Sequence, residues 1–203
     1  GVDLASFKQM YDIGSNYEIE FYRDRNHVYY VSDKNLYEII GSDPPTFSQF
    51  PAGYAGYKDR KYVYYYDAKN KVLRTLPGAD APSFKRQLLS YANVDSGITL
   101  VPGLDLWKDK NSLYLFDFKN SEWRRIKNLD VSKAAFIFDG IMKYKSKIFY
   151  INSSTPEPVK VTDDAAHFKV VPHSANALYS DSKNIYTYSP KESVVRKLAV
   201  DKS

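Results

Sequence analysis

Apolar and polar residues alternate in short runs along the chain, and one pattern of nine residues returns five times. An aromatic residue precedes a polar turn that begins with Asp. An aliphatic residue and then an aromatic one stand four and five positions after that Asp. The full copies are Tyr22–Tyr30, Tyr57–Tyr65, Trp107–Leu115 and Tyr179–Thr187, and a copy two residues shorter and lacking the Asp is Tyr144–Tyr150.

This pattern predicts a β-hairpin. Asp and Asn side chains bond their own backbone and tolerate left-handed conformations, which suits a tight turn. The run of Val, Ile, Tyr and Phe after the turn suits a return strand. The repeated aspartates are therefore interpreted as structural turn residues: Asp24, Asp59, Asp109 and Asp181.

A second motif, Gly-x-Asp-x-x-Ser/Thr-Phe, alternates with the hairpins. It stands at Gly1–Phe7, Gly41–Phe47 and Gly78–Phe84, with weaker versions at Asp130–Phe136 and Asp164–Phe168. Asp followed by Ser or Thr predicts a capped single turn, with the Phe as an apolar plug. Successive Asp residues of this motif are 34 to 50 residues apart, so the repeat is about 35 to 40 residues long.

Each repeat divides into four short strand-like pieces, and the third piece is apolar on both faces. Val28 and Tyr30 point one way and Tyr29 and Val31 the other. A strand of this kind must be covered on both faces, as in stacked blades or layers. The chain is predicted as a single repeat domain, residues 1–203, with units of about 1–43, 44–80, 81–130, 131–164 and 165–203.

The predicted fold class is all-β with internal repeats. A five-bladed β-propeller is favoured, and an open β-solenoid or meander of five β-hairpin units is the alternative. Closure is favoured because the chain starts and stops at the same point of the unit. A solenoid would also need polar terminal units, whereas the first and last units look as apolar as the middle ones. The only helical candidates are short pieces around 3–10 and 83–91.

Composition narrows the function further. Aromatic residues make up 16% of the 203 residues, with 19 Tyr, which favours strands. The absence of Cys excludes disulfides, thiolate zinc sites and cysteine nucleophiles. The net charge is +5, but Lys and Arg are interleaved with Asp in the turns, which indicates a solvated rim. We therefore expect no nucleic-acid partner, no membrane span and a monomer.

The core Tyr-Lys-Asp-Lys/Arg-Asn-x-Val-Tyr-Tyr resembles the DKNYY repeat family of bacterial proteins. The best matches are Arg23–Tyr30, Lys58–Tyr65 and Lys108–Tyr114, and the companion motif is matched at Gly41–Phe47 and Gly78–Phe84. The resemblance covers most of the chain and is weak in the fourth unit. It implies an exported or envelope-associated protein of unknown role, hence an extracytoplasmic location in the periplasm or cell envelope. It carries no catalytic or ligand residues.

The sequence offers little for catalysis. His27, His167 and His173 lack metal-ligand spacing, and no nucleophile elbow or glycine-rich phosphate loop is present, so no metal, cofactor or catalytic residue is predicted. An enzyme would have to use carboxylates, because propellers can host glycoside hydrolases whose acids project into the axial channel. The candidates for that role are Asp12, Glu18, Glu20, Asp105 and Asp139.

The leading hypothesis is a non-catalytic extracytoplasmic binding or scaffold module that recognises a protein or a glycan. The carbohydrate-active hydrolase with axial Asp and Glu residues is the alternative. Aromatic platforms stack on sugars and anchor interfaces, so the predicted binding residues are Tyr91, Trp107 and Trp123. The insertion between Phe84 and Trp107 is where a repeat scaffold would carry a grafted function.

Overall fold

The chain is all-β, as predicted. The structure is a computed structural model, and it describes residues 1–11, 19–50, 56–87, 106–117, 120, 122–126, 129–138, 140–151, 157–171, 178–189 and 194–198. Its strands form five four-stranded antiparallel sheets. The helical turns within the described residues are two short 3-10 turns, η2 (Ala81–Ser83) and η3 (Val131–Lys133).

Each sheet is a meander in which the strands pair in chain order. The first sheet holds β1 (Lys8–Tyr11), β2 (Glu20–Arg23), β3 (Val28–Ser32) and β4 (Asn35–Glu38). The second holds β5 (Ser48–Gln49), β6 (Tyr57–Lys58), β7 (Val63–Asp67) and β8 (Val72–Thr75). The third holds β9 (Lys85–Arg86), β10 (Leu106–Lys108), β11 (Leu113–Asp117) and β12 (Glu122–Ile126).

The fourth sheet holds β13 (Ala134–Phe138), β14 (Ile141–Tyr144), β15 (Lys147–Tyr150) and β16 (Val159–Thr162). The fifth holds β17 (Lys169–Val171), β18 (Leu178–Ser180), β19 (Ile185–Ser189) and β20 (Val194–Lys197). Every sheet lies inside one of the five units expected from the repeat. The chain folds into two compact units, residues 1–85 with 118–123 and residues 86–117 with 124–203.

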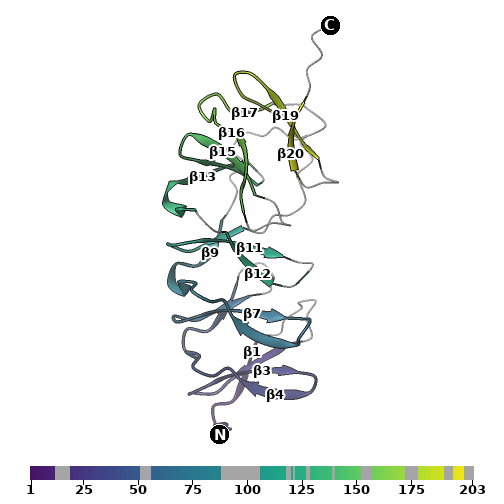
Figure 1. Cartoon of the computed structure of the whole chain (residues 1–203). Helices are drawn as coiled ribbons and strands as arrows, with labels where there is room; N and C mark the ends of the chain where they lie inside the picture. Colours follow the sequence, from purple (N-terminus) through teal and green to yellow (C-terminus); the bar gives the residue numbers. More distant parts are fainter. Residues whose placement is uncertain are drawn as a thin grey trace. The chain divides into compact units, whose positions relative to one another are not determined.

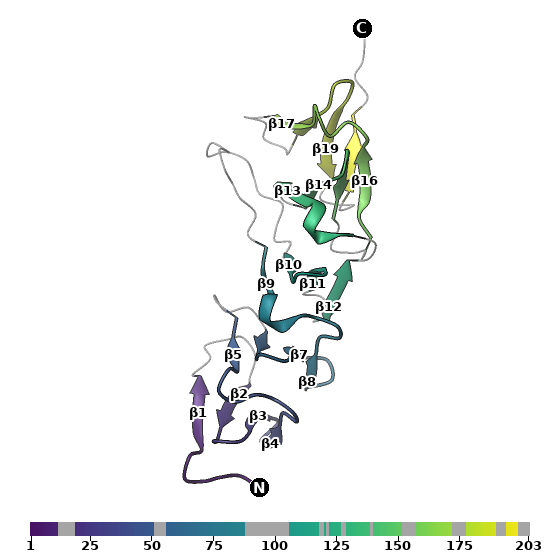
Figure 2. The same cartoon turned by 90° about the vertical axis from the view of Figure 1, so that its left-hand side faces the viewer.

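The two helical candidates are wrong wherever the structure describes them. The segment 3–10 is a single turn that runs into β1, and Ser83 ends η2 just before β9. Figure 2 shows the short coil of η2 leading into β9. The cause is the capping Asp80, whose carboxylate accepts from the Ser83 N–H, after which Phe84 turns the backbone to an extended conformation. Residues 88–91 of the second candidate lie outside the described residues.

The faces of the sheets follow one rule. We call the valine face the one that carries the aliphatic residue four positions after the turn Asp, and the tyrosine face the one that carries the aromatic residue after it. The valine-face residues are Val28, Val63, Leu113, Ile185 and, in the short fourth hairpin, Ile148; the tyrosine-face residues are Tyr29, Tyr64, Tyr114, Tyr186 and Phe149.

In the first compact unit, the valine face of the first sheet packs on the tyrosine face of the second. Phe21 and Val28 are fully buried in one cluster with Tyr57 and Tyr64. The ring centroids of Phe21 and Tyr57 are 4.2 Å apart. Figure 1 shows these two sheets in successive layers. These aromatic rings are removed from water only when the two sheets pack together, so the contact stabilises both sheets.

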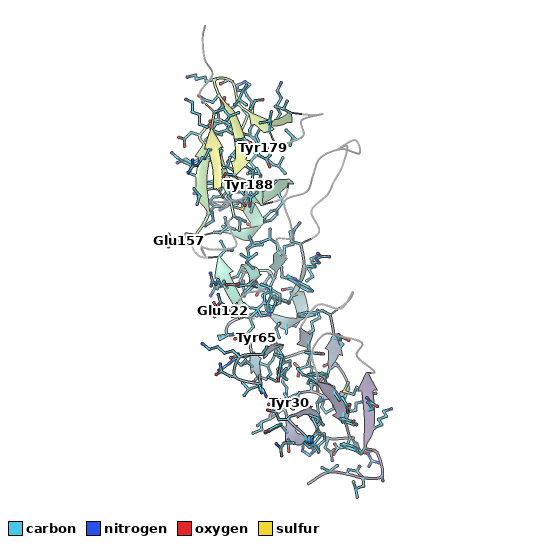
Figure 3. All side chains as sticks on the ribbon, turned by 90° about the vertical axis from the view of Figure 1, so that its right-hand side faces the viewer. Tyr30, Tyr65, Glu122, Glu157, Tyr179 and Tyr188 are labelled. Atoms are coloured by element: carbon cyan, nitrogen blue, oxygen red, sulfur yellow. The ribbon has the colours of Figure 1, made fainter. Side chains whose placement is uncertain are left out.

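The second compact unit repeats the arrangement twice. Leu113 and Leu115 of the third sheet cluster with Met142 of the fourth. Ile148 of the fourth sheet clusters with Tyr179 of the fifth. Figure 3 labels Tyr179 and Tyr188, which both lie on the tyrosine face of the fifth sheet. It also labels Tyr30 and Tyr65, which stand two residues after the valine-face residues of the first and second sheets. The prediction that central strands are covered on both faces holds best for β11, whose five residues are all buried.

Candidate functional site

The repeated aspartates sit at the centre of a hydrogen-bonded cluster that joins the two sequence motifs. Asp59 is 3% exposed, and its Oδ1 accepts from the backbone N–H groups of Lys61 at 2.6 Å and Tyr62 at 2.7 Å. Its Oδ2 accepts from the Tyr64 hydroxyl and from the backbone N–H of Asp43, both at 2.8 Å. One carboxylate thus fixes the turn, the tyrosine face and the capped turn that opens the same sheet.

The cluster recurs with the same partners. Asp24 accepts from Asn26, His27, the Tyr29 hydroxyl and the N–H of Asp3. Asp109 and Asp181 likewise accept from two turn N–H groups and from the hydroxyls of Tyr114 and Tyr186. Asp181 also accepts from the hydroxyl of Thr162 in β16 at 2.8 Å and, at 3.3 Å, from the side-chain amide of Asn184.

The fourth hairpin indicates the role of the tyrosine hydroxyl that donates to the turn Asp. Its loop is the two residues Lys145 and Ser146, with Lys145 at φ 57°, and it has no Asp. At the position that is Tyr in the other four sheets it has Phe149, which lacks a hydroxyl. The hydroxyl therefore occurs only where a carboxylate is present to accept from it.

Protonation equilibria in the first cluster result from these bonds. Burial raises the pKa of Asp24, but the hydrogen bonds from Asp3, Tyr29, Asn26 and His27 outweigh it and hold the pKa well below its usual range. Burial, together with the smaller effect of the hydrogen bond to Asp24, raises the pKa of Tyr29 to about 12. The carboxylate is ionised and the phenol neutral at neutral pH, which is a structural arrangement rather than an acid–base pair.

A cation next to each of the first two clusters reaches the next capped turn along the chain. Arg23 donates from Nη1 to the Pro44 carbonyl at 3.2 Å. The equivalent Lys58 donates from Nζ to the Phe84 carbonyl at 2.9 Å and to the Ala81 carbonyl at 3.4 Å. Burial lowers the pKa of Lys58. These bonds tie successive repeats together through side chains as well as through apolar faces.

A cleft of about 350 Å³ opens beside the first cluster, and another of about 670 Å³ opens beside Asp181; the first is the candidate functional site because of its excess of cations over carboxylates. Its lining includes the cations Lys8, Arg23 and Arg25, the carboxylate Asp24 and the ring of Pro45. Asp24 is saturated by its four donors, and Lys8 and Arg25 are exposed. Neither Lys8 nor Arg25 forms an ion pair with any carboxylate in the described part of the chain.

The positive charges of these side chains repel one another when no anion is bound. Lys8 and Arg23 are direct cross-strand partners in β1 and β2, and like charges directly opposite destabilise a sheet. In the second and fifth sheets the equivalent pairs, Ser48–Lys58 and Lys169–Ser180, each contain one cation. In the second sheet Arg60, the equivalent of Arg25, is neutralised by Asp43 at 3.1 Å.

Neither of the two tryptophans predicted to bind a ligand lines this cleft. Trp107 is 2% exposed and belongs to β10, so its ring presents no surface to a ligand. Trp123 in β12 is partly buried, and the ring of Phe84 lies against it at 5.6 Å between centroids. Tyr91 lies outside the described residues.

Four of the five carboxylates proposed for a hydrolase, Asp12, Glu18, Asp105 and Asp139, also lie outside the described residues. The fifth, Glu20, is exposed in β2 and accepts from the Tyr22 hydroxyl. Within the described ranges, no three His, Asp or Glu side chains gather as metal ligands. Nor does any helix there have the length and apolar character needed to cross a membrane.

Comparison with known proteins adds no relative to this picture: no family model and no curated protein matches the chain. The cleft itself was not predicted from the sequence, which pointed to a solvated rim of turn charges. Lys8, Arg23 and Arg25 stand at positions that the second and fifth repeats fill in part with Ser, but the third repeat fills them with Lys85, Lys108 and Lys110, so the sequence alone does not single out the first repeat. Only the strand register brings Lys8 opposite Arg23.

Proposed function

We propose that this protein is a non-catalytic binding module, in which stacked four-stranded sheets serve as a scaffold for recognition of a protein or glycan partner. The observation that carries the proposal is the use made of the repeated carboxylates. Each is occupied by turn N–H groups and a tyrosine hydroxyl, as at Asp59 and Asp181. A carboxylate that is saturated with donors has no lone pair left for proton transfer or nucleophilic attack.

The location proposed for the module is outside the cytoplasm. It rests on the resemblance of the hairpin motif to the DKNYY repeat family and is compatible with a chain that contains no Cys. Its test is cell fractionation of the native host protein with an antibody to this chain. Recovery of the protein in the soluble cytoplasmic fraction would contradict the proposed location.

For the arrangement of the five sheets, the composition of the last valine face supports the open array over the closed propeller. Ile185 is 37% exposed, whereas its four equivalents are 0% exposed. By register the same face carries the polar residues Lys169, Ser180, Thr187 and Arg196 beside the apolar Val171 and Leu178. A polar outer face is typical of the terminal unit of a repeat array. Small-angle scattering discriminates the two, because a closed ring is more compact than an open array of the same mass.

The binding function is tested by screening the purified chain on a glycan array and in pull-downs from envelope extracts, alongside hydrolysis assays on the same glycans. We expect binding without product formation. Turnover of a bound glycan would support the hydrolase instead. Binding that survives loss of the first repeat's cleft would place the recognition surface elsewhere on the scaffold.

A further inference from the structure

We propose that the cleft of the first repeat binds the carboxylate or phosphate group of an acidic saccharide, with Lys8 and Arg25 as its ligands. This inference rests on the proposed binding function and names its ligand class. The two side chains lie at the rim of one cleft, and both are exposed. An ammonium and a guanidinium at one concave site suit an anion, because charge-assisted hydrogen bonds are the stronger ones.

The cost of assembling the site points the same way. Lys8 faces Arg23 across the β1–β2 ladder, and the lining residues of the cleft comprise three cations and the single carboxylate of Asp24. Asp24 carries a single negative charge, and both of its oxygens already accept from four donors, so Lys8, Arg23 and Arg25 leave an excess of positive charge at the cleft. A bound anion would relieve the repulsion, which gives binding a favourable electrostatic contribution.

Arg23 has a different part. Its guanidinium donates to the Pro44 carbonyl, which holds it against the wall of the cleft. It therefore contributes positive potential and fixes the Pro44–Pro45 wall, while the long side chains of Lys8 and Arg25 close on the ligand. Removal of Arg23 would disturb the wall as well as the charge, so the test avoids it.

The size and lining of the cleft favour a saccharide over a protein surface. Its volume of about 350 Å³ lies at the lower end of the range typical of small-ligand sites, roughly 300–1,000 Å³. Protein partners instead bury broad surfaces. Pro45 is exposed in the wall and offers an apolar ring on which the C–H face of a sugar can lie.

The experiment is titration of the full chain with a uronic-acid oligosaccharide, monitored by ¹H–¹⁵N NMR. Its neutral counterpart and an acidic peptide of equal charge are the comparison ligands. The uronate should shift the backbone signals of Lys8 and Arg25, and the neutral sugar should not. Affinity should fall steeply with added salt because the contacts are exposed ion pairs.

The variant Lys8→Gln/Arg25→Gln should weaken uronate binding by about tenfold or more, the equivalent of losing one charge-assisted bond. The matched control is Lys69→Gln/Lys169→Gln, which removes the same charge from two exposed lysines that do not line the cleft and should bind like the wild type. Gln keeps a polar side chain at each position while removing its charge. Thermal melts should stay unchanged or rise slightly as the Lys8–Arg23 repulsion is removed.

Three results would overturn the inference. If the control variant weakened uronate binding equally, the effect would come from the net charge of the protein and not from the cleft. Tighter binding of the acidic peptide than of the uronate would replace the saccharide by a protein partner. If glycan or protein binding were detected but left the Lys8 and Arg25 signals unmoved, the binding module would stand and the cleft would be excluded as its site.

Discussion

The hydrogen-bond cluster around Asp59 makes a quantitative prediction for the variant Tyr64→Phe. The change removes one hydroxyl from a ring that is 1% exposed and leaves its volume almost unchanged. It deletes one bond of 2.8 Å to a buried carboxylate. A hydrogen bond to a charged group contributes about 1.5–3 kcal/mol, and the three donors that remain on Asp59 place the loss near the lower limit, about 1.5 kcal/mol.

The variant Asp59→Asn should cost more, about 3 kcal/mol. An amide keeps one acceptor oxygen, so its NH₂ group must face the donors that met the other carboxylate oxygen. The Tyr64 hydroxyl can rotate to accept from that NH₂, but the Asp43 N–H cannot and is left without an acceptor in a buried place. Because both variants act on one bond, the double variant should cost less than the sum of the two.

The measurement is urea denaturation monitored by far-UV circular dichroism and tryptophan fluorescence. Tyr62→Phe is the matched control, because its ring stands in the same turn, is 44% exposed and should change the free energy of unfolding by less than about 0.5 kcal/mol. If Tyr64→Phe is no more destabilising than Tyr62→Phe, the cluster does not hold the repeat together, and the account given for its four copies fails.

Three further predictions concern pH and packing. The pKa values of Asp24 and Asp181 in the folded protein lie below the ordinary 3.8. The stability that these two carboxylates contribute is therefore complete above about pH 4 and is lost as the pH falls through their folded pKa values. In an acid titration, the circular dichroism should stay native-like at about pH 4 and change only well below it. The pKa of Tyr29 is raised to about 12 from 10.0, so the contribution of Tyr29 to stability is complete below pH 10 and is lost as the pH rises toward 12. Absorbance at 295 nm, which reports tyrosinate, should therefore show a late ionisation phase that coincides with unfolding. Gly56→Ala should destabilise by about 1–3 kcal/mol, because its new Cβ would lie 2.2 Å from the buried ring of Phe50; a denaturation midpoint equal to that of the wild type would show that the ring can move aside at no cost.

The repeat and the class of fold could be predicted from the sequence because period-two patterning and turn chemistry are local properties. The hairpin turn at Asp24 was predicted from the Tyr22–Tyr30 pattern, and it lies between β2 and β3. The pairing of the Asp with the capped turn was not predicted, since Asp3 and Asp24 are 21 residues apart and only folding brings them to 2.9 Å. Trp107 illustrates the limit for site prediction, because an aromatic residue suited to binding is equally suited to burial.

The helical candidates failed for a related reason. The segment after Asp3 has apolar spacing compatible with a helix, but the Ser6 hydroxyl donates back to the Asp3 carboxylate and closes a single turn. A capped turn and the first turn of a helix share the same opening chemistry, and the contacts of the residues beyond that turn decide between them. Here Phe7 packs on Tyr22 with ring centroids 5.3 Å apart, and this contact draws the chain into β1.

The packing of valine face on tyrosine face has a direction, because each sheet presents two different surfaces. A copied repeat therefore carries both halves of the junction it needs, one for the neighbour before it and one for the neighbour after it. Tandem gene duplication could lengthen such a protein by whole units without new contacts having to evolve, whereas an inverted or partial copy would meet its neighbour with the wrong surface. The number of repeats can thus change easily during evolution of this architecture, whereas the orientation of a repeat relative to its neighbours cannot.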